Sequence, residues 1–321
     1  MEQERLELAG FAQRIQEIKQ QISKVVVGQN YTIDLILTSI LAEGHVLLEG
    51  VPGIAKTLIA RTVSRLIDAD FGRIQFTPDL MPSDVLGTQV FNMKSGDFDF
   101  HKGPVFADIV LVDEINRAPA KTQAALFEVM QERQVTIDAN TYKMNPVFTI
   151  LATQNPVEQE GTYKLPEAQL DRFIMKISLT YPNAAEELEI LSRHNTNNAF
   201  TKLDDLRPVI KAEELISLRK MLTGVVVEPS LMNYIVSIVQ ATRAHRYIYL
   251  GASPRASVAL LQTAKAFALL QGRDFVTPDD IKFLAYPVLQ HRIILSTDAE
   301  LDGQTVGNVI KSVIANIEVP K

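Results

Sequence analysis

The sequence contains no cysteine, and none of its apolar runs approaches the roughly twenty residues that a membrane helix needs. Without cysteine the protein has no disulfide framework, no thiolate nucleophile and no cysteine-ligated zinc site. The five histidines show no close pairing of the kind that binds zinc. The chain opens with the acidic stretch Met1–Arg5, which lacks the pattern of a secretory signal peptide. We therefore expect a cytoplasmic protein with no transmembrane segment.

Positive charge is also in short supply. The 32 lysines and arginines are outnumbered by 38 aspartates and glutamates, which gives a net charge of −6 and a pI of about 5.5. A protein dedicated to duplex DNA usually carries a basic face, so this balance argues against nucleic acid as a partner. With 46% hydrophobic residues, the 321-residue chain can form one large domain or two medium ones.

Short apolar runs alternate with helical patterns in the first half of the sequence. The runs are nearly continuous, as parallel strands are when both faces of their sheet are covered. They predict an α/β fold, a three-layer αβα core on a five-stranded parallel sheet. The predicted strands are Val46–Leu48, Ile74–Phe76, Ile109–Val112, Phe148–Ala152 and Phe173–Leu179. Before them, apolar residues at spacings of three and four predict an N-terminal helix through Leu8, Phe11, Ile15, Ile18 and Ile22.

Two stretches interrupt this alternation, and their turn residues predict β-hairpins. The first pairs residues 90–93 with 98–100, and the second pairs 134–137 with 141–144. No strand is predicted after Pro182. The remaining segments look helical: Glu186–His194, Glu213–Leu222, Pro229–Arg246, Pro254–Gln271 and Pro278–Ile294. We place a boundary near residues 182–200, with an α/β core over residues 1–190 and an all-helical domain over 191–321.

The most informative stretch joins the first predicted strand to a helix. A strand, a glycine-containing loop and a helix start are the setting in which backbone N–H groups bind phosphates. Lys56 would reach the β- and γ-phosphates, and Thr57 would place its hydroxyl on Mg²⁺. Ala55 stands where the second glycine is expected, and a positive φ there would strain the loop. The candidate ATP-binding residues here are Gly50, Val51, Pro52, Gly53, Ile54, Ala55, Lys56, Thr57 and Leu58.

Two predicted strands end in polar side chains that suit nucleotide hydrolysis. Asp113 would hold the Mg²⁺ shell, and Glu114 would polarise the attacking water. Asn155 would orient that water or contact the γ-phosphate, although an ordinary turn residue before proline is an equally good account. Because ligands bind at the carboxyl ends of strands in open α/β sheets, we expect these side chains to lie beside Lys56.

Two arginines occupy positions that suit contact with an anion. Arg172 precedes the last predicted strand and is a candidate arginine finger, supplied to a neighbouring subunit's nucleotide. The alternative for Arg172 is an ion pair with Asp171 or Glu167. Arg255 lies in the first turn of a helix that Ser253 caps, where a cation opposes the helix dipole and suggests an anionic partner. The alternative for Arg255 is an ordinary surface arginine.

In this order the features resemble the Walker A, Walker B, sensor 1, arginine finger and sensor 2 motifs of an AAA+ ATPase. The blocks at residues 112–119, 130–135, 152–156, 165–173 and 251–256 are similar to those of the MoxR family, and the resemblance covers nearly the whole chain. It implies a P-loop AAA+ core followed by a helical lid. It also implies that Val27 and Gly28 lie at the adenine.

The resemblance implies a function as well. MoxR proteins are thought to be hexameric, chaperone-like ATPases that use ATP and Mg²⁺ to remodel, mature or activate client protein complexes. Some of their partners carry von Willebrand factor A domains. The two hairpins would be the helix-2 and pre-sensor-1 inserts, with Phe98 and Phe100 forming an aromatic face that grips the client. The alternatives are a nucleotide-gated regulatory scaffold and a DNA-acting AAA+ motor.

Overall fold

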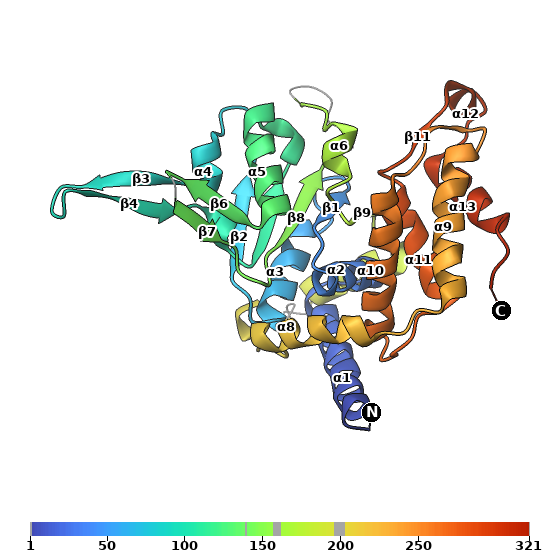
Figure 1. The fold of residues 1–321 in the computed structure, drawn as a ribbon. Helices are drawn as coiled ribbons and strands as arrows, with labels where there is room; N and C mark the ends of the chain where they lie inside the picture. Colours follow the sequence, from blue (N-terminus) through green and yellow to red (C-terminus); the bar gives the residue numbers. More distant parts are fainter. Residues whose placement is uncertain (1, 139, 157–161, 196–202, 321) are drawn as a thin grey trace.

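A five-stranded parallel sheet forms the centre of the computed structural model, which describes residues 2–138, 140–156, 162–195 and 203–320 (Figure 1). Its strand order is β2-β5-β8-β1-β9, and every neighbouring pair is parallel. The strands are β1 (Val46–Glu49), β2 (Phe71–Gln75), β5 (Ile109–Asp113), β8 (Thr149–Gln154) and β9 (Met175–Ser178). The predicted sheet is therefore confirmed, with ends shifted by a few residues.

Helices cover both faces of the sheet, because successive residues of each strand point to opposite sides. In β5, Ile109 and Leu111 join one hydrophobic cluster, whereas Val110 and Val112 join the other. The first cluster is completed by α1 (Glu2–Val25), α2 (Asn30–Leu41) and α3 (Lys56–Leu66). The second is completed by α4 (Pro82–Leu86) and α5 (Ala120–Glu132). This is the predicted three-layer arrangement.

The N-terminal helix docks through the face that its sequence spacing predicts. Phe11, Ile15, Ile18 and Ile22 are all buried in the first cluster. The side chain of Leu8 lies outside the described residues. Helix α1 contacts both α3 of the core and α10 (Pro254–Leu270) of the C-terminal region, so it bridges the two.

Both predicted hairpins are present and extend away from the sheet (Figure 1). They consist of β3 (Gly87–Asn92) with β4 (Asp97–Lys102), and β6 (Gln134–Ile137) with β7 (Asn140–Lys143). Phe91 and Phe98 are exposed and pair across the first hairpin, with ring centroids 5.2 Å apart. Phe100 instead packs on Tyr142 of the second hairpin at 4.4 Å. The two aromatic residues of the predicted face thus differ, since Phe100 packs between the hairpins whereas Phe98 stays exposed beside Phe91.

Helices dominate the chain after β9, as expected, but two short strands also occur there. The helices are α7 (Ala184–Asn195), α8 (Ala212–Met221), α9 (Pro229–Ala244), α10, α11 (Pro278–Leu289), α12 (Thr297–Leu301) and α13 (Val306–Ala315). Strands β10 (Ile248–Leu250) and β11 (Ile294–Leu295) pair antiparallel, so the expectation of no strand after Pro182 was wrong. The remaining short elements are helix α6 (Glu167–Leu170) and the 3₁₀ helices η1 (Pro104–Phe106), η2 (Ile115–Arg117), η3 (Leu203–Asp205) and η4 (Leu222–Gly224), of which η3 and η4 lie after β9. The exact division between core and helical region stays a prediction.

Helix α11 ends earlier than predicted because the chain after it is tied to the core. His291 Nε2 lies 3.0 Å from the carbonyl oxygen of Phe173. Arg292 donates from Nη2 to the same oxygen at 2.7 Å and from Nε to Asp171 Oδ1 at 2.7 Å. Asp171 also accepts the Ser253 hydroxyl at 3.1 Å. Asp171 therefore joins the segment before β9 to two parts of the helical region.

We predict that Asp171→Asn destabilises the protein, because the Arg292 side chain is only 3% exposed and would lose its charge partner. Removing one member of such a buried pair typically costs about 3 kcal/mol. Urea denaturation should show this as a lower midpoint. Asp279→Asn is the matched control, because Asp279 pairs with Lys282 while 89% exposed, and it should change stability little. Equal midpoints for Asp171→Asn and the wild type would contradict this account.

Candidate active site

The loop Gly50–Thr57 connects β1 to α3 at the carboxyl edge of the sheet. Gly50 N–H donates to the carbonyl oxygen of Gln154 at 3.2 Å, which fastens the start of the loop to β8. Gly53 has φ +87°, and Ala55 immediately before α3 has φ +62° and ψ 21°. Ala55 is therefore left-handed, and the strain that the sequence raises as a possibility is present.

The loop offers what a phosphate group requires. Within the described residues, the backbone N–H groups from Gly53 to Leu58 donate to no protein acceptor, as expected for the start of a helix. A Cβ atom built on Gly53 would meet nothing within 4 Å, so the loop is open there. Lys56 Nζ donates to the carbonyl oxygen of Gly50 at 2.7 Å and so lies across the loop. Burial lowers the pKa of Lys56, while Asp113 and Glu114 act in the opposite direction.

Asp113 and Glu114 lie at the end of β5, beside this loop. Asp113 is buried and accepts from Arg73 Nε at 2.8 Å. Glu114 has φ +57°, and its Oε2 lies 2.9 Å from Arg117 Nε. It also accepts from Gln75 Nε2 at 3.1 Å. Each acid thus has an arginine partner, and these cations offset the cost of placing two carboxylates so close to the core.

The end of β8 connects the two acids to Asn155. Thr153 Oγ1 accepts the backbone N–H of Glu114 at 2.9 Å and donates to Asp113 Oδ1 at 3.3 Å. Asn155, two residues further along, is buried. The structure therefore brings the loop, Asp113, Glu114 and Asn155 to one edge of the sheet, as the parallel register requires.

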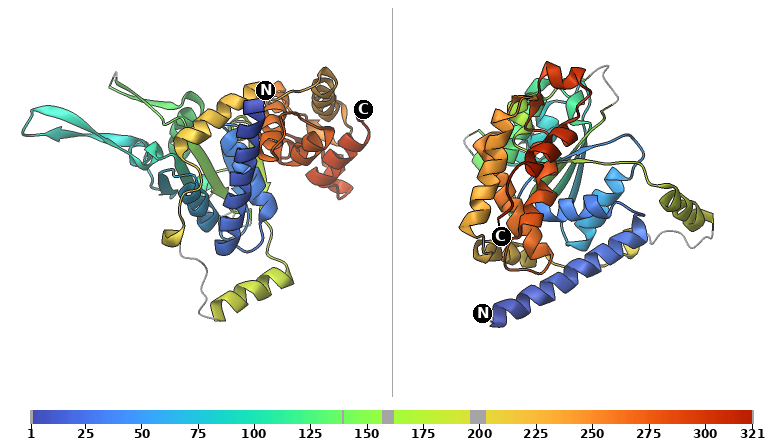
Figure 2. Two further views of the ribbon diagram at one scale, coloured as in Figure 1. Left: turned by 90° about the horizontal axis from the view of Figure 1, so that it is seen from below. Right: turned by 90° about the vertical axis from the view of Figure 1, so that its right-hand side faces the viewer.

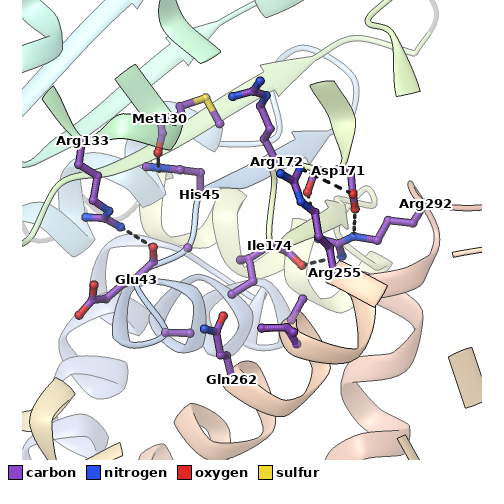
Figure 3. A pocket seen from close by; sticks show the side chains of 14 residues that line it. Glu43, His45, Met130, Arg133, Asp171, Arg172, Ile174, Arg255, Gln262 and Arg292 are labelled. Atoms are coloured by element: carbon purple, nitrogen blue, oxygen red, sulfur yellow. Dashed lines mark hydrogen bonds and ion pairs between the residues drawn. The ribbon is translucent and has the colours of Figure 1, made fainter. Parts of the chain in front are cut away.

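Arg172 and Arg255 lie elsewhere, in a pocket at the opposite edge of the sheet (Figure 3). The pocket has a volume of about 310 Å³, and four arginines and two acids line it. Its ionisable residues are Glu43, His45, Arg133, Asp171, Arg172, Arg255 and Arg292. Burial lowers the pKa of His45 to about 3, so this ring adds no charge at neutral pH. The excess of arginines makes the pocket suitable for an anion.

Each of the two arginines keeps donor capacity in this pocket. Arg172 Nη1 donates to the carbonyl oxygen of Phe127 at 3.0 Å, and its buried Nε has no partner. Among the described residues Arg172 forms no ion pair with Asp171 or Glu167, so that alternative was wrong. Arg255 lies 4.0 Å from Asp171 with its side chain 61% exposed (Figure 3). Both guanidinium groups therefore keep N–H donors that a bound anion could accept from.

The pocket and the loop lie at opposite ends of β1. His45 precedes β1 and Gly50 follows it, so the four residues of β1 separate them. At about 3.3 Å per residue, this separation is about 13 Å.

Comparison with known sequences agrees with a phosphate-binding loop beside two acids at the carboxyl edge of the sheet. The profile of the ATPase family associated with various cellular activities (AAA) matches residues 45–175, and an AAA lid domain profile matches residues 240–313. Chaperone MoxR1 of Mycobacterium tuberculosis is 42% identical to this chain over 310 residues, which cover 94% of the chain and 81% of that protein. The chain belongs to the MoxR family of AAA+ ATPases.

Two further similarities extend over nearly the whole chain. YeaC, an uncharacterised protein of Bacillus subtilis, is 46% identical over 93% of this chain and 92% of its own length. A crystal structure of a protein from Cytophaga hutchinsonii, described there as a candidate ATPase, matches with a TM-score of 0.91 and 44% identity. That match covers 100% of this chain and 99% of the other.

The sequence did not predict a role for several residues beside Asp113 and Glu114. Arg73 and Arg117, which pair with the two acids, are the clearest examples. Arg117 follows Glu114 by three residues, a spacing that could have indicated the pair. Arg73 could not be found this way, since β2 and β5 are neighbours only in the folded sheet.

We predict that Ala55→Gly raises the free energy of unfolding by up to about 1 kcal/mol. The left-handed conformation costs a residue with a Cβ roughly 1–2 kcal/mol, and glycine's extra freedom when unfolded offsets about half of this. Gly53→Ala is the matched control, because it introduces a Cβ at φ +87° where no atom would collide. Urea denaturation should therefore show opposite shifts. A destabilised Ala55→Gly variant would contradict the strain at this position.

Proposed function

We propose that this chain hydrolyses ATP to ADP and phosphate with Mg²⁺, and uses the energy to remodel, mature or activate client protein complexes. The observation that carries the proposal is the open loop Gly50–Thr57 beside Asp113 and Glu114. A phosphate-binding loop could serve binding alone, but an adjacent pair of carboxylates supplies groups for metal and water.

The residues at the carboxyl edge would divide the work. The loop N–H groups and Lys56 would hold the phosphates, while Val27 and Gly28 would lie at the adenine. Thr57 and Asp113 would hold Mg²⁺, which neutralises phosphate charge when it is bound. No cluster of three or more potential metal-ligating acids or histidines occurs in the described part of the chain, which suits an ion held largely by phosphates and water.

Glu114 would act as the base, and Asn155 would orient the water. Glu114 is only partly buried, and its present partners are Arg117 and Gln75. A carboxylate at this position can accept a proton from water that the neighbouring polar groups hold in place. Asn155 has an amide side chain, which can donate to one group and accept from another.

Arg172 and Arg255 would act on the nucleotide of a neighbouring subunit in a ring, as expected of a hexamer. Their pocket lies at the other end of β1 from the chain's own loop, and its arginine excess would neutralise charge on the transferring phosphoryl group. The first hairpin would meet the client through Phe91 and Phe98, which are 51% and 63% exposed. Proteins with von Willebrand factor A domains are one expected class of partner.

The protein would act in the cytoplasm. None of the helices in the described residues has the length and apolar character to cross a membrane. Nucleic acid is not the expected substrate, given the net charge of −6, although a DNA-acting motor remains an alternative function. A regulatory scaffold would bind ATP without turnover, and the next experiment separates it from an ATPase.

We predict that Glu114→Gln binds ATP as the wild type does but hydrolyses it about 10²-fold more slowly or worse, the scale for losing one general base. Glutamine keeps the shape of the side chain and removes its basicity. Calorimetric titration with ATP and a phosphate-release assay measure the two properties separately. Glu300→Gln, on the exposed surface of α12, is the control and should leave both unchanged.

Two results would contradict the assignment. Undiminished turnover by Glu114→Gln would show that another group acts as the base. A wild-type protein that binds ATP without hydrolysing it would favour the scaffold.

We also predict complementation between Lys56→Ala and Arg172→Ala. Each variant alone should lose turnover, the first through its phosphate site and the second through the site that it completes on a neighbour. Co-expressed with different tags and purified as mixed rings, they should regain part of the activity, because some interfaces then combine an intact Lys56 with an intact Arg172. Verified mixed rings with no recovery, beside active wild-type rings, would show that Arg172 does not act between subunits.

A further inference from the structure

The first turn of α7 is closed by a reciprocal pair of hydrogen bonds. Asn183 Oδ1 accepts from the backbone N–H groups of Ala185 and Glu186 at 3.0 and 3.1 Å. In return, Glu186 Oε2 accepts the backbone N–H of Asn183 at 2.9 Å. This is a capping box, and it occupies one of the two carboxylate oxygens of Glu186.

The other oxygen of Glu186 lies against Gly28. A Cβ built on Gly28 would come within 2.5 Å of Glu186 Oε1, and Gly28 itself has φ +69°. Helix α7 buries none of its described residues, and Figure 2 shows it beside the end of α1, projecting from the body. The approach of Glu186 to Gly28 is therefore a contact at the surface and not part of a packed core.

This contact lies on the same edge of the sheet as the phosphate-binding loop. Gln29 Nε2 donates to the carbonyl oxygen of Thr180 at 3.0 Å. The preceding residue, Leu179, donates its N–H to Glu49 at 2.8 Å, directly before Gly50. A nucleotide with its phosphates on the loop would thus extend toward Gly28 and Glu186.

The hydrogen-bonding groups at this place are complementary to adenine. Within the described residues, the backbone N–H groups of Val27 and Gly28 donate to no protein acceptor. Gly28 stands beside Glu186 Oε1, which is an acceptor. The Watson–Crick edge of adenine presents an acceptor at N1 beside the donor amine at N6, whereas guanine presents a donor at N1 beside an acceptor at O6.

We propose that Glu186 is a specificity-determining residue that selects adenine by accepting a hydrogen bond from its N6 amine through Oε1. A carboxylate can also bind guanine, but that requires both oxygens to accept from N1–H and the N2 amine together. The capping box orients Oε2 toward the Asn183 N–H, which leaves Oε1 as the oxygen of Glu186 that accepts from no protein donor among the described residues. The inference rests on the proposed nucleotide binding at Gly50–Thr57.

The test is Glu186→Gln, which can keep the capping box because glutamine serves at that position as well as glutamate. Its single oxygen is then committed to the Asn183 N–H, and its NH₂ group faces the base. A donor there opposes the adenine amine and suits guanine O6. The ratio of GMP-PNP to AMP-PNP dissociation constants, measured by calorimetry on the full chain with Mg²⁺, should therefore fall about 10-fold or more. The melting temperature should stay near the wild-type value.

Glu187→Gln is the matched control, because it makes the same charge change on the next, exposed residue of α7. It should leave the ratio unchanged. If Glu186→Gln keeps the wild-type ratio and melting temperature, Glu186 serves only as a helix cap and the inference is overturned. A wild type that prefers GMP-PNP would also overturn it. A wild type that binds neither nucleotide would overturn the proposed function itself, whereas AMP-PNP binding with an unchanged ratio would leave that function standing.

Discussion

The parallel pairing of β1 with β8 and β9 is the constraint on which both edges of the sheet depend. Register places Glu49 of β1 opposite Gln154 of β8, and Val112 of β5 opposite Ala152 of β8. Thr153 can therefore reach Asp113 and the backbone of Glu114, while Gln154 holds the start of the loop. A slip of one residue would turn Thr153 to the other face and separate these groups.

The amino edge of the sheet is fixed by His45. Its carbonyl oxygen accepts from Ile174 N–H at 2.8 Å, and its Nδ1 accepts from Ile150 N–H at 2.9 Å. Only a neutral ring can accept in this way, and burial keeps it neutral by lowering its pKa to about 3. Strand β1, which is hydrogen-bonded to β8 and β9, thus supports the loop at its carboxyl end and the arginine pocket at its amino end.

Much of this arrangement could be predicted from the sequence because it depends on local patterns. Apolar runs indicated the strands, and the residues around Lys56 and Asp113 carry chemistry that follows from their type and order. The positive φ of Ala55 could not be predicted from the sequence, because alanine disfavours this conformation. Nor could the sequence tell that Asp171 would pair with Arg292, more than one hundred residues away, instead of with its neighbour Arg172. Such choices depend on how helices pack.

The position of Asp171 in the chain links two parts of the molecule mechanically. Arg292, Ser253 and Arg255 all approach this carboxylate from the helical region. The next residue is Arg172, so the backbone that carries the candidate finger is held by the lid as well as by the sheet. A rotation of the lid must either pull this segment along or break those bonds. Under the proposed function, the angle of the lid would therefore set where one subunit presents Arg172 to the next.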